Sequence, residues 1–237
     1  MNRVSSKSIS VFIVFFLLKI TLSFSQSPSN TIGGWLMFFN QTKIHKNWSL
    51  HSEIQYRSYE IAPNSEQLLI RAGINYHISS STSATIGYGN ITNYAYDNTI
   101  NPGIQVAEDR IWQQFVMKNN TGKFFFEHRY RLEQRWINHQ NNSNRYLNRV
   151  RYLLRITVPL NKKVIEKSTL FIGFYNEVFL HLTNTPFDRN RLYGALGYQL
   201  LPSANLQVGY LAQTVGTTTK QYIQVAINYN IDLTKKN

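Results

Sequence analysis

The 237-residue chain contains no cysteine, so neither a disulfide nor a cysteine-ligated metal site can form. A lipid-anchored cysteine after the N-terminal segment is excluded for the same reason. Acidic residues are also few, with 12 Asp and Glu against 25 Lys and Arg and a formal net charge of +13. The N-terminal apolar run, Val11–Leu18, ends after eight residues at Lys19, whereas a membrane-spanning helix needs about 20. These absences argue against a disulfide-stabilised fold, a lipoprotein and a helical membrane anchor.

The N-terminal segment has the composition of a secretory signal peptide. Arg3 and Lys7 supply positive charge before the short apolar run, and small residues follow it. We therefore expect residues 1–25 to be a signal peptide and residues 26–237 to form one domain of an exported protein.

Apolar and polar side chains alternate through most of the remaining sequence. Near the C-terminus, Ile223, Val225 and Ile227 fall on one face and Gln224 on the other. This period of two is typical of a β-strand with one apolar side. Eleven segments have strand character, at residues 33–42, 47–59, 66–78, 82–93, 108–118, 122–136, 145–160, 168–181, 189–200, 204–214 and 219–233. No segment has convincing helical periodicity, so the fold class is all-β.

Alternating strands along an exported chain are typical of a transmembrane β-barrel in the outer membrane. Most segments exceed the roughly 9–11 residues that a tilted strand needs to cross a bilayer. Short connections are expected on the periplasmic side, near residues 43–46, 79–81, 119–121, 161–167 and 201–203. Longer ones are expected outside, near residues 60–65, 94–107, 137–144, 182–188 and 215–218. We expect an antiparallel barrel of about 10–12 strands, twelve rather than ten, since bacterial barrels normally have an even number.

A soluble barrel such as a lipocalin is the alternative, because its charges would simply face water. The number and length of the strands argue against it, since a small closed soluble barrel uses about eight. In a membrane barrel, the charged face would line the lumen instead. The expected lumen residues are Glu53, Arg57, Arg71, Glu127, Arg129, Arg131, Glu133, Arg135, Arg149, Arg151, Arg155, Glu177 and Arg191.

Arginine and glutamate side chains inside a barrel would offset part of their desolvation cost by pairing. Because arginines outnumber acids, we expect some guanidinium groups to meet water or anions. Two interpretations stay open: a packed ion-pair network that makes a narrow barrel rigid, and a passage that prefers anions.

The sequence predicts no catalytic, metal-binding or cofactor-binding residues. The six histidines lie in separate segments, no Gly-x-Ser-x-Gly pattern occurs, and no acidic cluster resembles a calcium loop. Nucleic-acid binding is not expected either, because arginines fall inside the strand pattern while lysines gather in the connections.

Several short motifs occur together along the chain: Gly34-Trp35-Leu36, Lys46-Asn47-Trp48-Ser49-Leu50, Gln55-Tyr56-Arg57, Arg110-Ile111-Trp112-Gln113-Gln114, residues 126–135, Arg149-Val150-Arg151-Tyr152 and Asp188-Arg189-Asn190-Arg191. As a set they resemble an uncharacterised family of outer-membrane β-barrels, domain of unknown function 2490. The resemblance covers nearly the whole mature chain. It implies an exported barrel of undefined biochemical role, with no catalytic residues to carry over.

We therefore expect a non-enzymatic, integral protein of the outer membrane of a Gram-negative bacterium, structural or weakly pore-forming, with an arginine-rich lumen. Its expected partners are outer-membrane lipid, the barrel-assembly machinery during biogenesis, and small anionic solutes. The alternatives are a barrel enzyme that acts on outer-membrane lipids and a soluble periplasmic binding protein.

Overall fold

The computed structural model describes residues 31–61, 64–96, 103–140 and 143–234. The predicted signal peptide, residues 1–25, lies outside the described residues. Eleven strands are found in the described part of the chain: β1 Gly33–His45, β2 Trp48–Ser58, β3 Ser65–His77, β4 Thr82–Tyr94, β5 Ile104–Thr121, β6 Phe124–His139, β7 Arg145–Pro159, β8 Leu170–His181, β9 Phe187–Leu201, β10 Ala204–Val215 and β11 Thr218–Asp232. None of these residues belongs to a helix that could cross a membrane.

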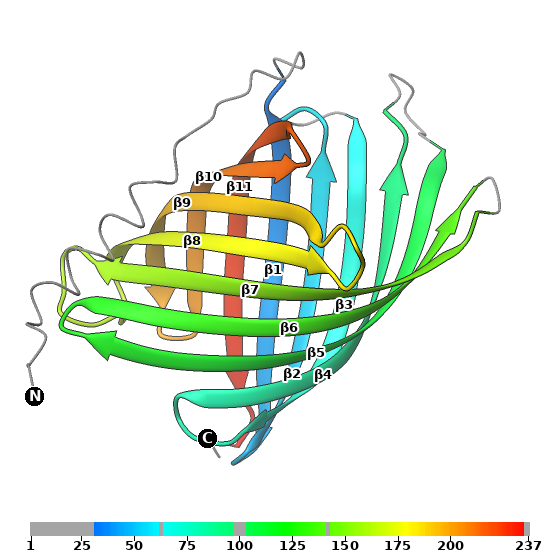
Figure 1. Cartoon of the computed structure of the whole chain (residues 1–237). Helices are drawn as coiled ribbons and strands as arrows, with labels where there is room; N and C mark the ends of the chain where they lie inside the picture. Colours follow the sequence, from blue (N-terminus) through cyan, green and yellow to red (C-terminus); the bar gives the residue numbers. More distant parts are fainter. Residues whose placement is uncertain (1–30, 62–63, 97–102, 141–142, 235–237) are drawn as a thin grey trace, which may run out of the picture.

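The strands follow one another around a closed barrel (Figure 1). The ten successive pairs are antiparallel, whereas β1 and β11 close the barrel in parallel, with Gly33 opposite Tyr222 and Lys43 opposite Asp232. With an odd number of alternating strands, the first and last run in the same direction, so only a parallel pair can close the ring. The predicted all-β barrel is confirmed. The preference for twelve strands is wrong, because the parallel pair removes the need for an even number.

Each predicted segment corresponds to one observed strand, and the connections lie at two opposite ends. We call the end with connections 46–47, 78–81, 122–123, 160–169 and 202–203 the turn end. The other, with 59–64, 95–103, 140–144, 182–186 and 216–217, is the loop end. The predicted alternation in length fails at two places, because connection 160–169 at the turn end is long and connection 216–217 at the loop end is as short as the shortest turns.

The barrel wall exposes apolar side chains on its outer face and buries charged side chains on its inner face, which is the reverse of the usual arrangement in a soluble protein. Among the described residues, 42 large hydrophobic side chains are exposed, whereas only 14 hydrophobic residues are buried. Ile70 and Leu196 are typical of the outer face, and both are more than half exposed. Glu133 and Arg149 are typical of the inner face and are almost completely buried. The wall is therefore apolar outside and charged inside.

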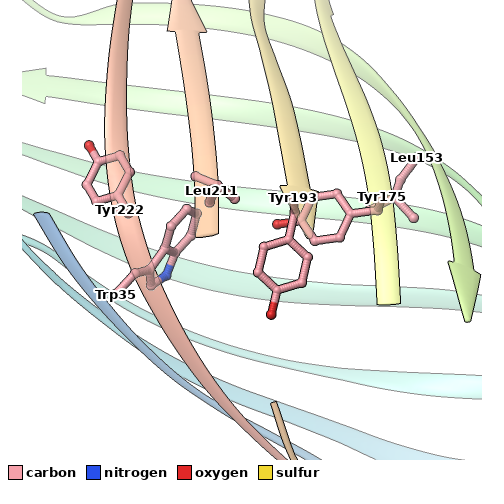
Figure 2. Packing of buried hydrophobic residues seen from close by; sticks show 6 residues of the cluster. All are labelled: Trp35, Leu153, Tyr175, Tyr193, Leu211 and Tyr222. Atoms are coloured by element: carbon pink, nitrogen blue, oxygen red, sulfur yellow. The ribbon is translucent and has the colours of Figure 1, made fainter. Parts of the chain in front are cut away.

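One sector of the inner face is apolar (Figure 2). Trp35 of β1 meets Tyr222 of β11 edge to face, with ring centroids 5.8 Å apart. Tyr175 of β8 stacks on Tyr193 of β9 at 4.7 Å. Strand β10, in the same sector, has no charged residue and contributes the fully buried Leu211. The buried charged side chains lie on the inner faces of β2, β3 and β5–β9, so charged and aromatic residues share β8 and β9.

Two glycines create room inside the wall for Trp112 of β5. A Cβ atom on Gly87 would lie 2.5 Å from the indole ring, and one on Gly73 would lie 3.0 Å from it. Because neither glycine has a side chain there, the indole packs close against the backbone of β3 and β4. It is thereby held where the guanidinium groups of Arg71 and Arg131 face it, at 5.6 and 4.9 Å from the ring centroid.

Candidate functional site

Buried charge in the barrel interior is unbalanced. Among the described residues, eight buried arginines accompany five buried carboxylates. The arginines are Arg57, Arg71, Arg110, Arg131, Arg135, Arg149, Arg151 and Arg191, and the acids are Glu53, Glu108, Glu133, Glu177 and Asp188. A buried charge without a partner is strongly unfavourable, so the contacts of these groups decide what the interior can do.

Glu133 of β6 is the centre of the network. Its Oε2 atom accepts hydrogen bonds from Arg149 Nε at 2.9 Å and Nη2 at 2.5 Å, and its Oε1 atom accepts one from Arg151 Nη1 at 2.6 Å. Arg110 and Arg131 lie 3.9 Å from the same carboxylate. Glu133 therefore balances guanidinium groups from β5, β6 and β7 together.

Glu177 of β8 links strands that are not neighbours. It accepts hydrogen bonds from Arg151 of β7 at 2.7 Å and from Arg129 of β6 at 2.8 Å, and Arg191 of β9 lies 3.7 Å away. The contact with Arg129 passes over β7, so it depends on the curvature of the closed wall. On the opposite side, Arg71 lies 3.4 Å from Glu53.

Glu108 holds two arginines by paired hydrogen bonds, a role that the sequence did not predict. The Nε and Nη2 atoms of Arg110 donate to its two oxygens at 2.5 and 3.0 Å, and those of Arg135 do so at 2.6 and 3.0 Å. The predicted strand began at residue 108, whereas β5 begins at Ile104. The alternation of Glu108, Arg110 and Trp112 was the signal that could have placed Glu108 inside.

Asp188 is the second acid that sequence reasoning missed. It accepts a hydrogen bond from Arg149 Nη1 at 2.6 Å and lies 3.2 Å from Arg189. The pairing of β8 with β9 shifts register between Phe179 and Leu180, and Asp188 falls in that irregularity. A bulge of this kind breaks the period of two, so alternation alone could not assign the side chain to the lumen.

The predicted lumen residues differ in depth. Ten of the thirteen are buried. The side chain of Arg129 is slightly exposed. Glu127 and Arg155 lie nearer the turn end, form an ion pair at 3.3 Å and are more exposed than Arg129. Arg57 forms no ion pair with any described residue and instead lies over the ring of Trp35.

Aromatic rings face many of the excess guanidinium groups. The Cζ atom of Arg57 lies 3.6 Å from the centroid of Trp35, and that of Arg191 lies 4.9 Å from it. Phe179 has Arg151 at 4.2 Å and Arg191 at 4.6 Å. Such cation–π contacts stabilise a desolvated cation by about 2 kcal/mol, which offsets part of the cost of burying the excess guanidinium groups.

The side chains nearly fill the space between the walls. A barrel of more than about eight strands is wide enough to leave a cavity unless long side chains occupy it. Here the arginines and aromatic rings leave a cavity of about 70 Å³, which ten arginines and two glutamates line. Arginine side chains therefore dominate the lining of the small space that remains in the interior.

A cluster of polar and aromatic side chains lies at the loop end of the barrel. Glu66 of β3 accepts a hydrogen bond from the Tyr222 hydroxyl of β11 at 2.9 Å, and this hydrogen bond crosses over β1 and β2. The Glu66 carboxylate also lies 3.1 Å from the Lys220 ammonium group. Lys220 is 4.8 Å from the ring of Tyr59, and Tyr96 packs edge-on against Tyr59. Burial raises the pKa of the Tyr59 hydroxyl, and the Glu66 carboxylate adds to the shift.

Ser49 and His77, which the sequence left unconnected, meet at the turn end of the lumen. The Ser49 Oγ atom lies 2.8 Å from His77 Nε2 and accepts a hydrogen bond from Asn75 Nδ2 at 3.0 Å. Asn75 in turn accepts from Thr85 at 2.7 Å. A catalytic histidine needs a third group that orients its other ring nitrogen, and no contact of that kind is present among the described residues. Ser49 is also almost completely buried.

Polar side chains on the outer face are paired with neighbours. His128 lies 2.9 Å from the Tyr152 hydroxyl, and Asn148 accepts from Tyr146 at 3.0 Å. Asn176 donates to Asn190 at 3.0 Å. No register shift occurs between β6 and β7, so a bulge does not explain His128 or Asn148. These groups are satisfied within the wall, as an apolar surrounding would require.

No group of three or more potential metal-ligating side chains occurs within the described ranges. Neither a curated protein nor a solved structure matches the chain. A family described as "Protein of unknown function (DUF2490)" matches residues 32–224, which is most of the chain. The chain belongs to the DUF2490 family.

Proposed function

We propose that the protein is an integral β-barrel of a Gram-negative outer membrane and acts as a closed, non-enzymatic scaffold. One observation carries this proposal: the outer face of the wall is apolar while the charges are inside. In water, such a continuous apolar belt would be unfavourable and would promote aggregation. In a bilayer, the same belt contacts hydrocarbon, and every backbone group of a closed barrel is paired.

Aromatic pairs at both ends of the outer face support a membrane position. Trp48 packs against Tyr76 at the turn end, with ring centroids 4.9 Å apart, and Trp136 packs against Tyr146 near the loop end at 5.3 Å. Rings of this type are typical of the two interfaces of a membrane barrel.

Lysines support the orientation that the connections suggested. Seven of the eight described lysines are at the turn end, and only Lys220 is at the loop end. The seven are Lys43, Lys46, Lys118, Lys123, Lys162, Lys163 and Lys167. We assign the turn end to the periplasm, where their ammonium groups can reach lipid phosphates.

The filled lumen favours a scaffold over a pore. Ion conduction needs a continuous passage, whereas Glu133 and Glu177 tie guanidinium groups across the interior. Purified protein inserted into planar bilayers is therefore expected to leave the membrane electrically silent. After incubation, phospholipids in vesicles that contain the protein are expected to remain unhydrolysed, because Ser49 is buried and its histidine has no orienting partner.

An open porin at equal protein concentration serves as the positive control for insertion and detection. Reproducible stepwise currents with anion preference would contradict the closed scaffold and favour the second candidate, an anion passage, which the excess of arginine motivates. Lipid hydrolysis that is lost in Ser49→Ala would contradict the non-enzymatic part of the proposal.

A further inference from the structure

The cavity inside the barrel has more positive charge than its own walls can balance. Ten arginines and only two glutamates line it, and the wider set of buried residues also has an excess of arginine. Aromatic rings compensate some of this charge, but a ring face accepts no conventional N–H hydrogen bond. The cavity therefore combines residual charge with donors that still need acceptors.

Three guanidinium nitrogens that belong to cavity-lining residues have no hydrogen-bond acceptor. They are Arg57 Nε, Arg71 Nη1 and Arg129 Nε. Arg57 and Arg71 are only 5% and 6% exposed, so bulk water does not reach them freely. Leaving such a donor unsatisfied costs about 1–3 kcal/mol, and more for a charged group. An acceptor inside the cavity would remove that cost.

The size and donors of the cavity indicate what kind of acceptor fits. A volume of about 70 Å³ holds about five to seven water-sized positions at 10–15 Å³ each, which leaves room for the five heavy atoms of a tetrahedral oxyanion. Water would supply acceptors but no charge, whereas an oxyanion supplies both. Guanidinium groups match the paired oxygens of such ions.

We propose that the barrel interior binds one small tetrahedral oxyanion, of the phosphate or sulfate class, between Arg57, Arg71 and Arg129. The ion is enclosed and integral to the folded interior, in contrast to a solute in transit. This inference goes beyond the scaffold role and does not depend on the compartment in which the barrel resides.

Equilibrium dialysis of radiolabelled phosphate against the detergent-solubilised barrel, freed of phosphate and sulfate during purification, tests the proposal. The expected result is one bound phosphate per barrel in a chloride buffer of constant ionic strength, displaced by sulfate. Arg57→Gln and Arg71→Gln should each weaken binding about 10- to 100-fold, since each removes a charged hydrogen-bond donor. Arg145→Gln makes the same charge change at the exposed start of β7 and should bind phosphate as the native protein does.

Folding of each variant is checked by its heat-modifiable migration on gels. If a variant does not fold, the native barrel is also dialysed against sulfate, and its uptake of the two ions tests the proposal. No uptake of either ion by the native barrel at millimolar concentration would overturn the proposal, and so would equal affinity in folded Arg57→Gln, Arg71→Gln and Arg145→Gln. Either failure would leave the closed scaffold intact, because bilayer silence does not require a bound ion.

Discussion

Glu133→Gln is expected to lower the free energy of unfolding by about 3–5 kcal/mol, the usual cost of removing one partner from a buried ion pair. Glu133 is completely buried and accepts hydrogen bonds from Arg149 and Arg151. Glutamine keeps the shape of the side chain but removes its charge. The guanidinium groups around it would then remain buried without their main counter-charge. Urea unfolding of the barrel in lipid vesicles, followed by tryptophan fluorescence, measures the change.

Glu166→Gln is the matched control. Glu166 lies in the exposed connection 160–169 at the turn end and pairs with Lys162 at 2.9 Å. Exposed pairs of this kind contribute less than about 1 kcal/mol, so the same chemical change should have little effect. Equal stability of Glu133→Gln and the native protein would mean that the buried network does not hold the barrel together.

Ile70→Arg is expected to destabilise the barrel in vesicles by about 2–4 kcal/mol, the cost of an arginine on the lipid face near the bilayer centre. Ile70 lies midway along β3 on the outer face and is 52% exposed. In a soluble protein, an arginine at so exposed a position would be almost neutral. The size of the effect therefore separates a lipid-facing wall from a water-facing one.

Ile61→Arg provides the comparison, since Ile61 is also exposed but lies in connection 59–64 at the loop end. Its unfolding free energy should stay within about 0.5 kcal/mol of the native value, as for most surface substitutions. If both arginine variants were as stable as the native protein in vesicles, the outer face of β3 would not contact hydrocarbon.

Local periodicity explains why the strands were predictable. An alternating segment such as residues 222–233 specifies both a strand and its apolar face, so the eleven segments correspond to β1–β11. Closure is a non-local property. The alternation within β1 and β11 does not indicate that the two strands pair in parallel, with Gly33 opposite Tyr222. The expectation of an even number of strands failed for that reason.

The candidate site was less predictable, because its contacts join distant strands. Alternation assigned Arg151 and Glu177 to the polar parity, but the hydrogen bond between Arg129 and Glu177 depends on how β6 and β8 approach across β7. Asp188 escaped prediction because of the irregular pairing between β8 and β9. The contact of Arg57 with the ring of Trp35 could not be inferred either. Alternation places Arg57 on the polar face of its strand, but it does not say whether the guanidinium group meets an acid or an aromatic ring.

The most direct test of the account is the environment of successive residues along β11. Because the chain has no cysteine, single cysteines at positions 225, 226, 227, 228 and 229 can each take one spin label in vesicles. Labels at 225, 227 and 229 should collide with oxygen dissolved in hydrocarbon and be protected from a water-soluble nickel reagent, whereas those at 226 and 228, on the inner face, should have little contact with hydrocarbon oxygen. Strong nickel contact with little oxygen contact at 225, 227 and 229 would contradict a lipid-facing outer wall.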